Sequence, residues 1–351
     1  MKRLIAAATI SIVGLAAHAE TYELRMSASH STDVPWVGQL STLVVAKTND
    51  RLEALGSEDR VEWIETYGGS LYGYKHTLEA VTDGITDAGW VGTLWEGSKM
   101  PLQNVTFFTP FVTDDLVSML QIMNEMHREM PELQAAWDDQ NAVLLGASGV
   151  ETYHLFTNFP VNSLADIKGR RILAPGASAL WINHLGAVPV NGALPTYQNQ
   201  VRSGLADGMV VIVTGAFPHR LYEEAPYVTL VGLGAMMTGG FAINKDVWES
   251  LSDDVRFVLA ELGEEYTVAH AEEVISRYEK SLEQLSELGA IVSELPSEEV
   301  DHWAQTMPNL AGDWLEDNSH VGARAVLSAY MEKVRSAELT PRIDWAERNF
   351  E

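Results

Sequence analysis

The sequence contains no cysteine, so disulfide bonds, thiol nucleophiles and thiolate metal sites are all excluded. Basic residues are also scarce, because 23 lysines and arginines face 49 aspartates and glutamates. After the N-terminal segment, charged residues interrupt every hydrophobic run before it reaches membrane-spanning length. A fold without disulfides must rely on its core, and a hydrophobic content of 46% allows this.

The first 19 residues have the three parts of a secretory signal peptide. Lys2 and Arg3 form the charged start, residues 4–16 the apolar stretch, and the Ala-His-Ala of residues 17–19 the cleavage site. We therefore expect an exported, soluble chain of 332 residues, with an uncleaved anchor as the alternative. This length is sufficient for two domains with separate cores.

The excess of acidic residues excludes some partners. The predicted signal holds two of the basic residues and none of the acidic ones, which leaves a net charge of −28 on the mature chain. A surface of this sign repels nucleic acid and anionic membranes. Such a surface suits a high-salt environment, where salt screens the repulsion between the acidic side chains. It is equally consistent with an ordinary acidic exported protein.

Strand-like and helix-like periodicities alternate along the chain, which predicts an α/β fold with mainly parallel sheets. The predicted strands span residues 22–27, 61–66, 87–91, 142–148, 153–158, 171–174, 209–213 and 239–244. The predicted helices span residues 37–55, 77–83, 115–139, 252–288, 297–307 and 321–337, with a shorter one between 175 and 184. The helix at 252–288, which begins at a Ser-Asp-Asp cap, would measure roughly 55 Å and exceed one small domain.

Several short motifs follow one another in a recognisable order. A Gly-Gly-Ser-Leu loop at 68–71 precedes Leu-Glu-Ala-Val-Thr-Asp-Gly at 78–84, and Asn-Ser-Leu-Ala-Asp-Ile-Lys-Gly occupies 162–169. Phe-Ala-Ile-Asn-Lys at 241–245 comes later. Each motif alone is weak, but their order and spacing resemble the periplasmic solute-binding proteins of TRAP transporters, of the DctP type. The likeness covers nearly the whole mature chain.

This resemblance implies a two-lobed periplasmic binding protein in which each lobe is a mainly parallel sheet flanked by helices. Lobe I would comprise residues 20–148 with 237–270, and lobe II residues 149–236 with about 289–335. The helix at 252–288 would brace both lobes.

The resemblance also implies a receptor and not an enzyme, with no cofactor and no metal. Such proteins close over a small solute in the periplasm and deliver it to the small and large membrane subunits of a TRAP permease. We expect a monomer. A solute-sensing receptor and an exported enzyme on the same scaffold are the alternatives from other classes.

The sequence departs from the family where a substrate carboxylate is usually gripped by arginine. The main arginine position falls on Leu173, and a second one, used by some members, falls on Tyr153. An asparagine that often follows the Asp-Gly pair maps to about Val211. Arg170 and Arg171 come too early in the strand to replace the missing arginine simply. The departure argues against an organic acid as the solute.

Aromatic residues occur near the inferred cleft instead. They are Trp36, Tyr72, Tyr74, Trp90, Trp95 and Tyr153. Because aromatic faces attract cations, we expect a small amine or amino alcohol, such as ethanolamine or choline. Glu151 is the first candidate for its counter-ion, followed by Asp33 and Glu96. Polyols and sugars stay open because they also stack on aromatic rings, and any single ring could equally fill the core.

Other chemistry finds little support in the sequence. His30 lies in the loop that follows the first predicted strand, where we expect a hydrogen bond to the solute or a solvent-facing side chain. If the solute is an acid after all, Arg170 or His30 would have to hold it. No HExxH motif occurs, and the Gly-rich loop at 68–73 lacks the lysine of a phosphate-binding loop.

Overall fold

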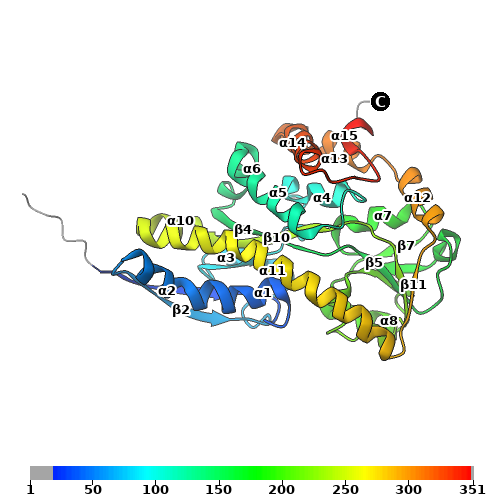
Figure 1. The fold of residues 1–351 in the computed structure, drawn as a ribbon, viewed down its shortest axis with the longest axis horizontal. Helices are drawn as coiled ribbons and strands as arrows, with labels where there is room; N and C mark the ends of the chain where they lie inside the picture. Colours follow the sequence, from blue (N-terminus) through cyan, green and yellow to red (C-terminus); the bar gives the residue numbers. More distant parts are fainter. Residues whose placement is uncertain (1–18, 349–351) are drawn as a thin grey trace, which may run out of the picture.

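The computed structural model describes residues 19–348 and has an α/β fold built on two sheets (Figure 1). Apart from Ala19, the predicted signal peptide lies outside the described residues. No helix between residues 19 and 348 combines the length and the apolar character needed to cross a membrane.

The first sheet, in lobe I, has the strand order β2-β1-β3-β10-β4. Its strands are β1 (Thr21–Ser27), β2 (Arg60–Thr66), β3 (Ala88–Val91), β4 (Ala142–Val150) and β10 (Met236–Asn244). The helices of this part are α1 (Pro35–Gln39), α2 (Ala46–Leu55), α3 (Thr77–Thr82), α4 (Val105–Phe108), α5 (Leu116–Glu129), α6 (Pro131–Asp138) and α10 (Lys245–Ser250). A π-helical segment, Leu40–Val45, joins α1 to α2 and so continues the helix predicted for 37–55.

The second sheet, in lobe II, has the order β11-β9-β5-β8-β6-β7. Its strands are β5 (His154–Thr157), β6 (Arg171–Leu173), β7 (Val188–Val190), β8 (Gly208–Val211), β9 (Tyr227–Leu230) and β11 (Ile291–Glu294). The remaining helices are α7 (Ala179–Asn183), α8 (Leu194–Arg202), α9 (Val213–Ala216), α11 (Asp253–Glu287), α12 (Ser297–Thr306), α13 (Leu310–Asp317), α14 (Ala323–Ser336) and α15 (Trp345–Arg348).

The chain passes between the two sheets twice through short connections, residues 151–153 and 231–235. At each connection the chain leaves one sheet at the end of a strand and begins a strand of the other sheet at the same junction. The neighbouring strands of that other sheet end at this junction, so the new strand runs in the opposite direction to them. As a result β10 runs antiparallel to both of its neighbours, and so does β5. All other strands within each sheet point the same way, which confirms mainly parallel sheets and adds one reversed strand to each.

This topology brings the carboxyl ends of strands from both sheets to one place. Val150 ends β4 opposite Met236, and Val211 ends β8 opposite His154. The two connections also contact each other, because the backbone N–H of Gly234 donates to Thr152 Oγ1 at 2.9 Å. In open α/β sheets, ligands bind outside such carboxyl ends.

The long helix α11 is fixed to lobe I by a close backbone approach. A Cβ atom on Gly263 would lie 2.2 Å from the carbonyl oxygen of Leu145, and one on Gly146 would lie 2.1 Å from that of Gly263. Thr267 Oγ1 donates to the carbonyl of Ala147 at 2.9 Å one turn further on. The helix then continues past lobe II, as Figure 1 shows, which confirms a helix that braces both lobes.

Two expectations differ from the structure. The helix predicted for 115–139 is two helices, because Met130 is extended before Pro131, and Pro131 begins α6. The segment expected in lobe II, 289–335, is divided: β11 joins the second sheet, whereas α14 packs on α5 of lobe I through the ion pair of Lys333 with Glu125 at 2.9 Å.

The contact of α11 with β4 yields a prediction. We expect Gly263→Ala to lower the free energy of unfolding by roughly 1–3 kcal/mol, because the methyl group overpacks a backbone contact that cannot yield. The loss should exceed the gain from alanine's better helix propensity. Urea unfolding followed by circular dichroism measures it. The control is Gly97→Ala, where a Cβ meets nothing within 4 Å, and equal stability of the two variants would contradict the prediction.

Candidate functional site

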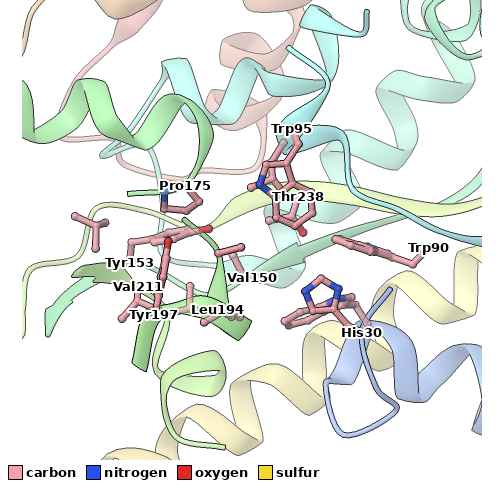
Figure 2. Close-up of a pocket in the computed structure, with 15 residues that line it drawn as sticks. His30, Trp90, Trp95, Val150, Tyr153, Pro175, Leu194, Tyr197, Val211 and Thr238 are labelled. Atoms are coloured by element: carbon pink, nitrogen blue, oxygen red, sulfur yellow. The ribbon is translucent and has the colours of Figure 1, made fainter. Parts of the chain in front are cut away.

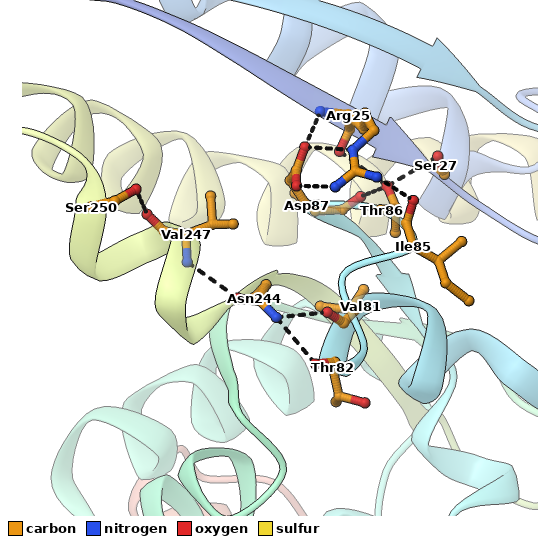
Figure 3. Close-up of polar contacts among 11 residues, drawn as sticks. Arg25, Ser27, Val81, Thr82, Ile85, Thr86, Asp87, Asn244, Val247 and Ser250 are labelled. Carbon is orange, nitrogen blue, oxygen red and sulfur yellow. Dashed lines mark hydrogen bonds and ion pairs between the residues drawn. The ribbon is translucent and has the colours of Figure 1, made fainter.

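A cavity lies at the junction of the two lobes, beside the carboxyl ends of β3, β4 and β8 (Figure 2). It measures about 50 Å³. Because one water needs roughly 10–15 Å³ on this scale, the space admits a few waters or a small solute. The lining residues are His30, Trp36, Trp90, Leu94, Trp95, Val150, Tyr153, Pro175, Ala193, Leu194, Tyr197, Val210, Val211, Ile212 and Thr238.

The wall from lobe I is a cluster of aromatic rings, which Figure 2 shows in part. The His30 ring stacks on Trp95 with 6.3 Å between centroids and meets the edge of Trp90 at 5.3 Å. Trp90 Nε1 donates to Ser148 Oγ at 2.8 Å, which fixes that ring to β4. Gly92 makes the cluster possible, since a Cβ there would lie 2.6 Å from Trp95 and 2.8 Å from Trp90.

The wall from lobe II is made of tyrosine and aliphatic side chains. Tyr153 follows β4 on the first connection, and its ring packs edge-on against Trp181 of α7, with centroids 5.4 Å apart. Tyr197 and Leu194 come from α8, and Val211 ends β8. Figure 2 shows these side chains on the opposite side of the space from Trp90, Trp95 and His30.

None of the lining side chains carries a charge at neutral pH. Lysine, arginine, aspartate and glutamate do not occur among them. Burial lowers the pKa of His30 from 6.5 to about 4, so its ring is neutral, and burial raises the pKa of the Tyr153 and Tyr197 hydroxyls. The cavity is therefore apolar and uncharged inside a strongly acidic protein.

Four polar atoms of the lining are buried without a hydrogen-bond partner among the described residues. They are Trp36 Nε1, Trp95 Nε1, the Tyr197 hydroxyl and Thr238 Oγ1. Thr238 stands where the register of β10 against β4 shifts, between Met237 and Gly239. Such irregularities redirect a side chain out of the ladder. Because leaving a buried polar group unpaired is unfavourable, a hydrogen bond from a ligand to any of these atoms would be favourable.

The structure brings together most of the site residues expected from the sequence. His30, Trp36, Trp90, Trp95, Tyr153 and Val211 all line the cavity. Tyr74, on a neighbouring turn, contacts Trp95 with ring centroids 5.0 Å apart.

Other expected residues lie outside the cavity. Leu173 is fully buried in β6, and Tyr72 is buried beneath β3, where its hydroxyl approaches Gly89. Arg170 stacks on the ring of Phe159, 4.2 Å from its centroid. Asp33 is exposed and accepts a hydrogen bond from Ser31. Glu96 is buried but does not line the cavity.

Glu151 was the expected counter-ion, and the structure does not bring it into the cavity. Its carboxylate accepts hydrogen bonds from the backbone N–H and the hydroxyl of Thr214, each at 2.7 Å. It faces a separate groove beside His154 and Tyr278. Burial raises its pKa to about 7. An ammonium group in the cavity would therefore have no carboxylate among the lining residues.

Sequence reasoning missed several lining residues. Tyr197 lies near the start of α8 and was not among the aromatic residues singled out from the sequence. For Thr238 and Val150 the only signal in the sequence was a position near the ends of β10 and β4, which adjoin the short connections between the sheets. For Pro175 the only signal was its position after β6. No group of three or more histidine, aspartate or glutamate side chains in residues 19–348 is placed to hold a metal ion.

Two α/β lobes with a cavity between them define a solute-binding protein of the periplasmic type. The profile of the family described as "Bacterial extracellular solute-binding protein, family 7" (DctP) matches residues 47–317. The chain belongs to this family, whose members are receptors for small solutes that work with TRAP membrane permeases.

Solved structures of TRAP solute-binding proteins have the same fold. One from a marine metagenome, described as specific for aromatic acids and bound to 3-hydroxybenzoate, is 18% identical with a TM-score of 0.79, over 91% of this chain and 99% of that one. One from Rhodoferax ferrireducens with benzoate is 16% identical (TM-score 0.77, 90% and 98%). One from Roseobacter denitrificans with β-D-glucuronate is 18% identical (0.73, 88% and 98%).

The buried histidines predict a loss of stability in acid. Burial lowers the pKa of His30 and His127 to about 4 and that of His154 to about 3, below the ordinary 6.5. As the pH falls, the unfolded chain therefore takes up these protons before the folded chain does. The contribution of the neutral histidines to the free energy of unfolding is complete above pH 6.5 and is lost as the pH falls toward 4. Burial also raises the pKa of the Glu151 and Glu96 carboxyls, and these two groups act in the opposite direction.

Urea unfolding between pH 7.5 and 4.5 measures this dependence. We expect His30→Gln to reduce the loss over that range by roughly 1–3 kcal/mol. The matched control is His302→Gln, because His302 is exposed. If both variants keep the slope of the unchanged protein, His30 does not stay neutral in the folded state.

Proposed function

We propose that this chain is the extracytoplasmic receptor of a TRAP transporter, and that it binds a small solute without a carboxylate group. The cavity residue set carries the proposal, since it contains no lysine and no arginine and its one histidine is neutral. The receptor would be exported by its signal peptide, act as a monomer in the periplasm, and deliver the solute to the small and large permease subunits.

A carboxylate in this cavity would be poorly compensated. Taking an ionised group out of water costs several kcal/mol unless the group is both paired with an opposite charge and hydrogen-bonded. The neighbours with 3-hydroxybenzoate, benzoate and glucuronate are described as complexes with acids, whereas Leu173 here fills the position where the resemblance expects an arginine. The net negative charge of the chain further opposes an anion.

Binding would follow an ordinary population shift. The lining comes from both lobes, so a solute contacts all of it only when the lobes are closed. A solute that binds the closed state better populates that state, and the permease would then recognise it. The turnover of an enzyme would need a titratable pair, and His30 is the only lining residue with a pKa near neutrality before burial.

A quaternary amine is the second candidate. The ring faces of Trp36, Trp90 and Trp95 favour it, since each stacked ring attracts a cation by about 0.5–2 kcal/mol. A quaternary nitrogen has no N–H group that requires an acceptor, so it tolerates the placement of Glu151 outside the cavity better than ethanolamine does. A solute-sensing role on the same fold would differ in its membrane partner and not in the cavity.

Thermal unfolding of the ligand-stripped mature protein against a solute panel tests the proposal. The panel holds benzoate, pyroglutamate and glucuronate as acids, and uncharged amides, ketones, alcohols and quaternary amines as non-acids. We expect at least one non-acid to raise the unfolding midpoint, since a ligand at 100 times its Kd stabilises by about 2.7 kcal/mol. The acids should leave the midpoint unchanged, and a larger shift with an acid than with every non-acid would overturn the proposal.

A further inference from the structure

We propose that the solute is an uncharged compound with one acceptor oxygen on a compact apolar body, and that the ring N–H groups of Trp36 and Trp95 bind this oxygen. This inference rests on the proposed function and narrows it to one class of solute. The residues that line the cavity hold four buried polar atoms without a partner among residues 19–348.

The unpaired atoms are biased toward donation. An indole nitrogen can only donate a hydrogen bond, and Trp36 Nε1 and Trp95 Nε1 are both buried and unpaired. The Tyr197 hydroxyl and Thr238 Oγ1 can donate or accept. No side chain that only accepts lines the cavity. A complementary solute must therefore supply an acceptor.

Of the three tryptophans that line the cavity, only Trp36 and Trp95 have an unpaired ring N–H group. Trp90 belongs to the same ring cluster, but its Nε1 is already bound to Ser148 Oγ at 2.8 Å. Trp95 has no such partner, and Figure 2 shows its ring nitrogen on the side of the ring that faces Pro175 and Tyr153 across the space. The Tyr153 hydroxyl reaches the same space from the other wall.

Both kinds of charged solute match these atoms poorly. A primary ammonium brings three donors and no acceptor, so it would leave both indole N–H groups unpaired. A carboxylate could accept from them, but no positive charge in the lining would compensate its own. A carbonyl, ether or hydroxyl oxygen accepts the same hydrogen bonds without a net charge.

The rest of the lining limits the polarity of the solute. Leu94, Val150, Leu194, Val210 and Val211 offer only apolar surface. A sugar or polyol would bury more hydroxyl groups than the few polar atoms of the lining can satisfy. The aromatic rings and these aliphatic side chains instead fit a compact apolar body.

Matched triplets of solutes test the sign of the charge directly. Each triplet is an amide, the corresponding acid and the corresponding amine on one carbon skeleton, for example isobutyramide, isobutyrate and isobutylammonium, or benzamide, benzoate and benzylammonium. Thermal shift and isothermal titration at pH 7.5 give the affinity order. We expect the amide to bind most tightly within every triplet that binds, and ketones of the same skeleton to bind as well.

Two substitutions test the donors with the tightest solute of this series. We expect Trp95→Phe and Trp36→Phe each to raise its Kd roughly 3- to 10-fold, because they remove one N–H group and keep an aromatic ring. The matched control is Trp137→Phe on α6, which removes a buried and equally unpaired indole N–H outside the cavity. It should leave the Kd unchanged.

Each outcome has a separate meaning. An acid that binds most tightly overturns both this inference and the proposed function. An ammonium that binds most tightly overturns the inference alone, as do unchanged affinities in the Trp36 and Trp95 variants. If no uncharged member of any triplet stabilises the protein, the inference is also wrong, while a quaternary amine that binds would leave the proposed function standing.

Discussion

The architecture depends on one constraint: two of the chain's passages between its sheets are short connections, residues 151–153 and 231–235, and a third runs through α10 and α11. Because each crossing strand enters the next sheet from the far end, β5 and β10 are reversed against their neighbours. The same crossings gather the ends of β3, β4 and β8 at one junction, and the cavity lies there. Tyr153 on the first crossing and Thr238 beside the second both line this cavity.

Much of the fold could be predicted from the sequence because its strong signals are local. The cap at Ser252 and the sustained periodicity after it define α11 almost to the residue. The strands β7 and β11 were missed because they lie at the two edges of the second sheet and contain no buried residue, so they have little hydrophobic pattern. The strand β9 was missed as well. The break at Pro131 was visible in the sequence, but the hydrophobic periodicity continues across it. The aromatic residues Trp90 and Trp95 were placed near the cleft from their order along the chain, and they line the cavity, whereas Leu173 is buried outside it.

The composition of the site was harder to predict because the direction of a side chain depends on distant partners. Glu151 and Tyr153 are two residues apart on one connection, yet only Tyr153 reaches the cavity, since Thr214 holds the carboxylate on another face. Thr238 and Tyr197 are contributed from far along the chain. The result is a cavity without charged side chains within a protein of net charge −26. If this cavity is the solute site, as we propose, selectivity in it would depend on hydrogen-bond direction and ring geometry more than on attraction between charges.

The glycine contact between α11 and β4 has a mechanical consequence. A helix of 35 residues is a rod roughly 52 Å long, and here one half is clamped to a sheet at backbone distance. Its far half contacts lobe II, where Tyr278 is hydrogen-bonded to His154 at 2.9 Å. When the lobes separate, this rod must either bend near the middle or let the second lobe slide along it. The clamped half and the half that contacts lobe II thus restrict the directions in which the two lobes could move apart.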